Sequence, residues 1–310
     1  MANIGKKKPL QGWQRAEAKA KNNRDERTFA MGNSNTRAYD VIADRILDLL
    51  DKGEVPWRKP WSLQPGMRPQ NAVSKRPYSG INSMMLGLSG YSDTRWLTFR
   101  GAQQLGGNVR KGQKATPITF WKQFKVKDKD ENGETVEKII PLLKYFSVFN
   151  VEQCEGLDLP PIETAKPFDA IEAAERIIAN MPNRPSIDHD GGDRAYYIPA
   201  LDTVHLPPRT AFGVADEYYS TAFHELGHST GHESRLNRHG METGIAPFGS
   251  ETYSREELAA EFTAAFLCNE SGIENTIENS AAYIRGWSKV IRKDRRLVIQ
   301  AASQGQKAAD

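Results

Sequence analysis

The segment STAFHELGHSTG, residues 220–231, contains two histidines four positions apart, His224 and His228, with Glu225 directly after the first. On an α-helix such a pair shares one face, so both imidazoles can reach one metal ion. A glutamate beside the first histidine can take a proton from metal-bound water. The segment therefore predicts a zinc site of the hydrolytic type. The alternative is that both histidines are surface residues of an ordinary helix.

A zinc hydrolase needs a third protein ligand and one open coordination position. The metzincin continuation HExxHxxGxxH is excluded, because Ser234 stands where its last histidine would be. Downstream, SREELAAEFTAAFL (254–267) places Glu257 and Glu261 four residues apart on one predicted helix face. This segment resembles the E-x-x-A-[DE] helix of gluzincin metallopeptidases. The resemblance implies that Glu257 is the third ligand and that Glu261 supports the ligands from outside the coordination sphere.

Other interpretations of these residues stay open. Ser254 and Glu257 also have the spacing of a helix capping box, which needs no metal. Glu261, His232 and His239 remain alternative third ligands. No motif identifies the group that would stabilise an oxyanion, and the candidates are Tyr196, Tyr197, Tyr253 and His232.

The chemistry of such a site is peptide hydrolysis. A bound metal lowers the pKa of its water toward about 7 and polarises a carbonyl. Glu225 would act as the general base and then deliver the proton to the leaving amine. A strand predicted at 195–206 precedes the helix, and an extended peptide can add to the edge of such a strand. Nuclease activity is disfavoured, because two nitrogens and one oxygen suit one metal and not a carboxylate-rich paired site.

Basic residues and tryptophans are concentrated in the first half of the 310-residue chain. Residues 1–160 hold 27 Lys+Arg and 17 Asp+Glu, a formal charge of +10, whereas residues 161–310 hold 15 and 22, a charge of −7. Five of the six tryptophans lie in the first half. This length favours two domains, and the split in charge indicates modules with different partners.

Cations alternate with aromatic rings in two parts of the basic half, VPWRKPW (55–61) and residues 110–125. Single-stranded nucleic acid requires both, because cations neutralise phosphates and rings stack on exposed bases for roughly 1–3 kcal/mol each. No recognition helix or zinc finger is evident for reading a duplex. The alternative is that the tryptophans fill a small core. The candidate DNA-binding residues are Trp57, Arg58, Lys59, Trp61, Arg110, Lys111, Lys114, Trp121, Lys122 and Lys125.

Apolar periodicity and turn residues predict the elements. Helical spacing runs over 39–50 and ends at Gly53, and a short helix follows Thr98. Strands at 115–127 and 135–151 flank the turn signal Asn132-Gly133. Later helices are expected at 170–178, 215–232, 254–271 and 280–302. The proline-rich, aperiodic stretch 157–167 is the expected linker.

Composition also bears on the compartment. The chain has no run of 18 apolar residues, so we expect no membrane-spanning helix and no membrane partner. Its first residues are basic without an apolar run behind them, unlike a secretory signal. Two cysteines cannot form a disulfide framework, which favours a reducing cytoplasm.

Ordered motifs along both halves resemble the ArdC-type antirestriction proteins of conjugative plasmids, and the first half also resembles the N-terminal region of certain plasmid primases. The resemblance covers about residues 36–310. It is carried by VPWRKPW, RPYSGIN (76–82), WLTF (96–99), NVRKGQKATPITFW (108–121), YFSVFNVEQCEGL (145–157), YYIPALDTVHLP (196–207), the two metal-site segments and the end of the chain from Trp287 to Asp310.

The resemblance implies an α+β protein with a single-stranded DNA-binding domain and a zincin-like metallopeptidase domain. We accordingly expect a basic flexible tail at 1–35, a mixed α/β DNA-binding domain at 36–156, the linker at 157–167, and a helix-rich zincin-like domain at 168–310. The implied role is protection of incoming plasmid DNA from host restriction during conjugation, with Zn²⁺ or another divalent ion as cofactor and a possible protein substrate. The alternative is a DNA-coating module whose metal site is structural or proteolytically inactive.

Overall fold

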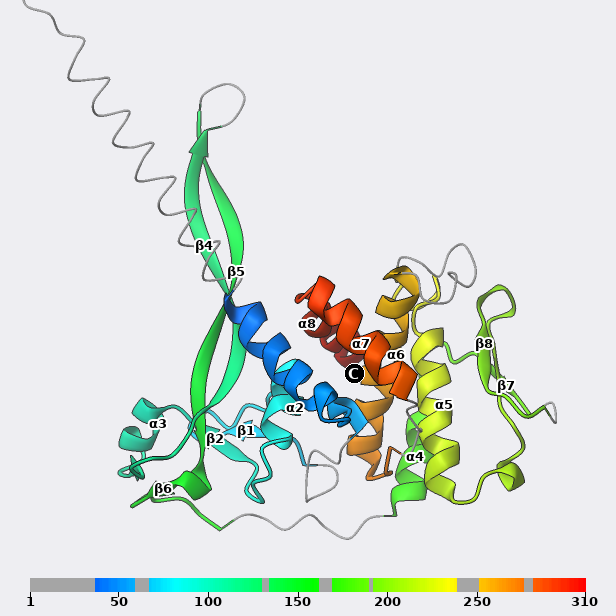
Figure 1. Ribbon diagram of the computed structural model, residues 1–310, viewed down its shortest axis with the longest axis horizontal. Helices are drawn as coiled ribbons and strands as arrows, with labels where there is room; N and C mark the ends of the chain where they lie inside the picture. The colour runs from blue at the N-terminus through cyan, green and yellow to red at the C-terminus, as the bar shows by residue number, and fades with distance from the viewer. Residues whose placement is uncertain are drawn as a thin grey trace, which may run out of the picture. The chain divides into compact units, whose positions relative to one another are not determined.

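The structure is a computed structural model, and it describes residues 37–58, 67–129, 134–161, 169–189, 192–238, 251–275 and 281–310. The described residues form helices and three β-sheets, which confirms the predicted α+β class (Figure 1). None of its described helices is both long enough and apolar enough to cross a membrane. The tail at 1–35 lies outside the described residues.

The first half of the chain contains a four-stranded sheet with short helices. Its strand order is β1-β2-β5-β4, and Trp96, Leu86, Ile118 and Val148 form a buried cluster there. A helix over 37–51 precedes the sheet and is followed by Gly53, whose φ of 79° favours glycine. The elements are η1 (Pro56–Arg58), β1 (Gln70–Asn71), α2 (Ile81–Gly87), β2 (Arg95–Leu97), α3 (Phe99–Gln104), β3 (Asn108–Val109), β4 (Thr116–Lys129), β5 (Thr135–Asn150), η2 (Val151–Gln153) and β6 (Cys154–Glu155).

The predicted helices and strands of this half are present, whereas the turn signal Asn132-Gly133 lies outside the described residues. Strands β4 and β5 lie within two residues of the expected bounds, and Thr98 begins α3 by accepting a hydrogen bond from Gly101 N. Part of the hairpin, β4 after Thr119 and β5 before Phe146, forms a compact unit with residues 37–40. The remaining described residues form the second unit.

The second half consists mainly of helices, with a small sheet of order β7-β9-β8 in which β7 and β9 are parallel and β8 and β9 are antiparallel. Asp169 begins the first helix by accepting a hydrogen bond from Glu172 N. The elements are α4 (Ala170–Ala179), β7 (Ser186–Asp188), β8 (Tyr196–Ile198), η3 (Pro199–Leu201), β9 (Thr203–His205), η4 (Arg209–Ala211), α5 (Ala215–Ser229), α6 (Glu251–Ser271), α7 (Ala281–Lys293) and α8 (Leu297–Ala309).

Two predicted elements of this half are wrong. The strand expected at 195–206 is two strands, because η3 begins at Pro199 and turns at Asp202, which has the left-handed φ of 47°. The helix expected at 280–302 is also broken into α7 and α8. Asp294 makes this break by accepting a hydrogen bond from Arg296 N, so the chain turns before Leu297.

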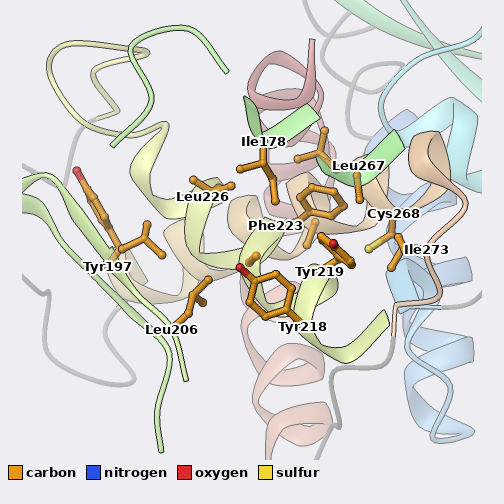
Figure 2. Close-up of a cluster of buried hydrophobic side chains, with 14 residues drawn as sticks. Ile178, Tyr197, Leu206, Tyr218, Tyr219, Phe223, Leu226, Leu267, Cys268 and Ile273 are labelled. Atoms are coloured by element: carbon orange, nitrogen blue, oxygen red, sulfur yellow. The ribbon is translucent and has the colours of Figure 1, made fainter. Parts of the chain in front are cut away.

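The core of the second half surrounds α5. Tyr218, Tyr219, Ala222, Phe223 and Leu226 are all buried, so these side chains form the side of the helix that faces the core. Figure 2 shows Phe223 and Tyr219 among side chains from α4 and α6, while Tyr197 and Leu206, from the sheet region, lie to their left. This core fixes the axis of α5, so the position of its polar histidine face is fixed as well.

Residues 41–58 pack against the C-terminal helices, in the same compact unit. Trp57 is only 1% exposed, and its ring centre lies 5.3 Å from that of Phe262 and 6.1 Å from that of Trp287. Asp51 pairs with Arg292 at 2.7 Å, which adds a contact to α7. Residues before and after the expected linker therefore pack into one core.

Candidate metal centre

Three side chains bring ligand atoms together where α5 and α6 pack. The Nε2 atoms of His224 and His228 are 3.2 Å apart. Glu257 Oε1 lies 3.4 Å from His228 Nε2, and Glu257 Oε2 lies 3.8 Å from His224 Nε2. Within the described ranges these residues form the one cluster of at least three potential ligands whose atoms are mutually this close. Two nitrogens and one carboxylate oxygen form the ligand set of a hydrolytic zinc site.

The helix positions explain this convergence. His224 and His228 are one turn apart on α5, and Glu257 lies in the second turn of α6 because that helix begins at Glu251. Ser254 is therefore inside the helix and is not its N-cap, so the capping-box interpretation of Glu257 is wrong. The glutamate is 9% exposed and faces the histidines instead.

Glu256 supports His228 from behind, a contact that the sequence analysis missed. Its Oε1 lies 3.4 Å from His228 Nδ1, while Arg238 Nε donates to Glu256 Oε2 at 2.9 Å. Arg238 also donates to Gly227 O at 2.8 Å, which ties it to α5. A carboxylate on the outer ring nitrogen orients a ligand histidine and raises its basicity. The sequence signal was the pair of adjacent glutamates, of which only the second was considered.

The pKa shifts describe a site suited to a cation. Burial raises the pKa of Glu256 and Glu257, but hydrogen bonds from Arg238 and His228 respectively outweigh it and lower both pKa values to about 2. Burial lowers the pKa of His228, yet its bonds to Glu256 and Glu257 hold it well above the usual value. Carboxylates that attract a proton to His228 also favour a divalent cation in its place. The residues present therefore fit a metal ion.

Two tyrosines border the third ligand. Tyr283 on α7 donates from its hydroxyl to Glu257 Oε2 at 3.4 Å. Burial, followed by the charge of Glu257, raises the pKa of Tyr253 to about 12, so its hydroxyl stays protonated at neutral pH. Among the residues predicted to stabilise an oxyanion, Tyr253 is the one that interacts electrostatically with Glu257 in the described structure. Tyr283 was not predicted, because nothing in the sequence relates α7 to this site.

The other oxyanion candidates lie in other contacts. Tyr197 donates to Asp202 Oδ1 at 2.7 Å and accepts from Arg235, which is a structural network. Tyr196 stacks on His205 at 4.7 Å, and His232 Nδ1 lies 2.8 Å from Ser234 Oγ. His239, an alternative ligand, lies outside the described residues.

Glu225 and Glu261 have different surroundings. Glu225 is 8% exposed on α5, and its charge helps raise the pKa of His228 and of Tyr253, which places it beside the cluster. Glu261 is 1% exposed and accepts a hydrogen bond from Arg58 Nε at 3.1 Å. Within the described chain, no hydrogen bond joins Glu261 to His224, so its predicted supporting role stays a prediction.

The predicted DNA-binding residues are divided by the structure. Trp57 is a core residue and Arg58 is paired with Glu261, so neither side chain is available to DNA. The prediction for Trp57 is wrong because its ring packs among the C-terminal helices and does not stack on bases. Lys59 and Trp61 lie outside the described residues. Arg110 donates to the carbonyl of Cys154 at 3.0 Å, and Lys111 and Lys114 are exposed around Gly112.

The hairpin presents the remaining candidates. Trp121 is 51% exposed, Lys122 is exposed, and Lys125 pairs with Glu137 at 3.2 Å. Phe120 is 57% exposed, and as the neighbour of Trp121 in the strand it lies on the opposite face. Both faces of this part of β4 therefore present an aromatic ring to solvent.

Two family models match the chain. Residues 36–149 match the N-terminal domain of anti-restriction factor ArdC, and residues 172–304 match a zincin-like metallopeptidase domain. Among curated proteins, a DNA primase TraC of Escherichia coli is 39% identical over 292 residues, covering 88% of this chain but 26% of the primase. This chain thus spans about a quarter of that relative. The uncharacterized protein y4eC of Sinorhizobium fredii is 31% identical, covering 89% of this chain and 91% of its own.

Solved structures extend the comparison. The metal-free crystal structure of the antirestriction protein ArdC from plasmid R388 matches with a TM-score of 0.69 and 36% identity, covering 88% of this chain and 95% of that one. The Mn(II)-bound structure of the same protein matches with a TM-score of 0.68 and 34% identity over the same shares. Because both domains match in order and an ArdC structure is covered almost completely, this chain belongs to the ArdC family of antirestriction proteins.

Proposed function

We propose that this protein binds single-stranded DNA through its basic half, protects incoming plasmid DNA from host restriction during conjugation, and hydrolyses a protein substrate at a divalent-metal site. The observation that carries the enzymatic part is the convergence of His224, His228 and Glu257, with the buried Glu225 beside them. Membership of the ArdC family supports the antirestriction role, and the cytoplasm is where incoming DNA meets restriction enzymes.

The proposed chemistry divides the work between a cofactor and the chain. His224, His228 and Glu257 would hold one divalent ion, which when bound activates water and polarises a substrate carbonyl. Glu225 accepts the water proton and passes it to the leaving amine. Tyr253 and Tyr283 keep protonated hydroxyls beside Glu257, where they fix its carboxylate. Zinc remains our expectation for the ion, and Mn(II) is the second candidate because the related R388 structure holds it.

The substrate path is proposed from the sheet. Strand β8 lies at one end of the order β7-β9-β8 among the described residues, so it is an edge strand of this sheet. An extended peptide can pair with such an edge through backbone hydrogen bonds, without a requirement for particular side chains. Only the three residues Tyr196–Ile198 form this strand, so we expect a short binding register and weak sequence preference.

The DNA-binding part of the proposal rests on two separate sets of exposed residues, one on the hairpin and one at the turn at Gly112. Exposed Trp121 and Phe120 provide flat surfaces for bases, while Lys111, Lys114 and Lys122 are exposed cations for phosphates. Stacking and phosphate neutralisation together bind single strands with little sequence preference. Duplex binding would not use the rings, because paired bases are already stacked on one another.

The deciding experiment compares Glu225→Gln with His224→Ala in a plasmid-transfer assay into a restricting host. We expect Glu225→Gln to retain metal and DNA binding while protection falls, because only proton transfer is removed. His224→Ala should lose both metal and protection. If both variants protect as well as the wild type and bind DNA normally, the alternative of a DNA-coating module with a proteolytically inactive site is correct.

A further inference from the structure

An arginine from the N-terminal region lies one helical turn from the metal ligand Glu257. Arg58 Nε donates to Glu261 Oε2 at 3.1 Å, and its Nη2 pairs with Glu261 Oε1, so the contact is bidentate. Both side chains are buried, since only 9% of the Arg58 side chain and 2% of the Glu261 side chain are exposed. Glu261 follows Glu257 by four positions, so both carboxylates lie on one face of α6.

Arg58 is held in place by its neighbour. Trp57 lies between Phe262 of α6 and Trp287 of α7, and is 1% exposed. Both residues belong to η1, which falls inside the region matched by the ArdC N-terminal family model, 36–149. A residue of the family's N-terminal domain thus reaches α6, the helix that carries Glu257.

The two ligand histidines show a parallel and a difference. Behind His228, Glu256 lies against the outer ring nitrogen and Arg238 holds Glu256. Behind His224, the ring nitrogen Nδ1 is buried and has no hydrogen-bond partner in the part of the chain that the structure describes. A metal-bound histidine almost always donates its outer N–H to an acceptor. Glu261, buried on the ligand face of α6 and held by Arg58, has the same helix and the same arginine support as Glu256.

We propose that Arg58 is a positioning residue for the metal site, supplied by the N-terminal region and acting through Glu261 on His224. This inference rests on the proposed metal site. Arg58 neutralises and orients the Glu261 carboxylate, so that Glu257 alone supplies the acidic ligand and Glu261 serves the outer nitrogen of His224. Metal affinity thereby depends on the docking of η1, and metal binding in turn stabilises that docking.

The chain offers a matched control. Arg68 also comes from the N-terminal region and pairs with α6, donating from Nε to Glu270 Oε2 at 3.2 Å. That pair is exposed and lies nine positions beyond Glu261. Loss of Arg68 removes a contact between the N-terminal region and α6, but it leaves the side of α6 that carries Glu257 unchanged. General loosening of the N-terminal region should therefore affect both arginine variants.

The test measures Mn(II) and Zn(II) dissociation constants for the full-length protein by calorimetry and chelator competition. The variants are Arg58→Met, Arg58→Lys, Glu261→Gln, the double variant Arg58→Met/Glu261→Gln, and Arg68→Met. We expect Arg58→Met to weaken binding by about 10–100-fold, as for other supports of ligand histidines. The metal affinity of Arg58→Lys should lie between those of the wild type and Arg58→Met, because lysine keeps the positive charge but cannot make the bidentate contact. Arg68→Met should stay within about twofold of the wild type.

The double variant distinguishes positioning from packing. If Arg58 acts through Glu261, the effects of the two single changes are not additive, and the double variant binds metal as Glu261→Gln does. If Arg58→Met does not fold, the comparison of the double variant with Glu261→Gln decides alone. The double variant should fold, because it leaves no unpaired charge buried at the site of the Arg58–Glu261 pair. Additive effects, or equal losses in Arg58→Met and Arg68→Met, overturn the inference. Failure of the wild type to bind metal, or full binding by His224→Ala, overturns the proposed metal site itself.

Discussion

Gly227 on α5 lies so close to α6 that a methyl group there would place its carbon 3.1 Å from Ala260 Cα and 3.2 Å from Ala260 O. These atoms belong to backbone, which cannot rotate away as the end of a long side chain can. Gly227 stands between His224 and His228, and Ala260 stands between Glu257 and Glu261 in sequence. The close approach of these two small residues therefore sets the distance across which the metal ligands meet.

Gly227→Ala should destabilise the protein and weaken metal binding together. Crowding in a packed interface costs about 1–3 kcal/mol, which exceeds the gain of about 1 kcal/mol that alanine brings to a helix. Thermal or urea unfolding with and without metal measures both effects. The control is Gly286→Ala on α7, where no atom lies within 4 Å of the added methyl. That change should stabilise the protein, and equal effects of the two substitutions would contradict the interface argument.

Three neighbouring glutamates should differ in their effect on metal affinity. Glu257→Ala removes a ligand atom, so we expect the largest loss, beyond that of Glu261→Ala. Glu256→Gln should weaken binding by about 10–100-fold, since it removes the carboxylate that orients His228. Competition with a metal chelator gives the three dissociation constants. A structure with metal on Glu261 or His232 in place of Glu257 would overturn this order.

The metal ligands could be predicted because their signal is local. His224 and His228 lie one turn apart on a helix whose apolar face is regular, and Glu257 was identified through the resemblance of its segment to the gluzincin helix. Glu256 was missed because adjacent residues on a helix usually point to different faces. Here the ring of His228 presents both nitrogens, so Glu256 and Glu257 each reach one of them.

Long-range packing was the part that the sequence could not supply. Trp57 has the same basic neighbours as a base-stacking residue, and nothing within VPWRKPW indicates that its partners are Phe262 and Trp287, more than 200 residues later. Burial also explains why the halves are poor units for a truncation experiment. A cut near residue 160 would separate Trp57 from its core, so full-length variants are the better test of DNA binding.

The network around Asp202 should make stability depend on pH. Hydrogen bonds from Arg235, and then from Tyr197, outweigh burial and keep the pKa of Asp202 below its ordinary value. A carboxyl whose pKa is lowered by folding stabilises the protein at pH values above its unfolded-state pKa of about 4. This stabilisation is lost as the pH falls through the pKa of the folded state. Asp202→Asn should cost about 1–3 kcal/mol at pH 7, and its difference from wild type should narrow below about pH 4.

Urea unfolding at several pH values measures this dependence. Asp193→Asn is the control, because Asp193 is 99% exposed and lies 3.9 Å from Arg194. It should unfold like the wild type at every pH. A loss in Asp202→Asn that stays constant from pH 7 to pH 3 would show that the asparagine disturbs packing and that the charge of Asp202 contributes nothing.

The hairpin should bind single-stranded DNA through Trp121. Trp121→Ala in the full-length protein should weaken binding to an oligonucleotide by on the order of 1–3 kcal/mol while the melting temperature stays unchanged, because the ring is 51% exposed. Trp96→Ala is the matched control, since Trp96 is 1% exposed and its loss should unfold the protein. Lys111→Ala should lower the salt slope of binding by about one, because one phosphate contact disappears. Fluorescence anisotropy across a salt series measures these effects. Tighter binding to duplex than to single strand, or an unfolded Trp121→Ala protein, would show that the ring does not stack on bases.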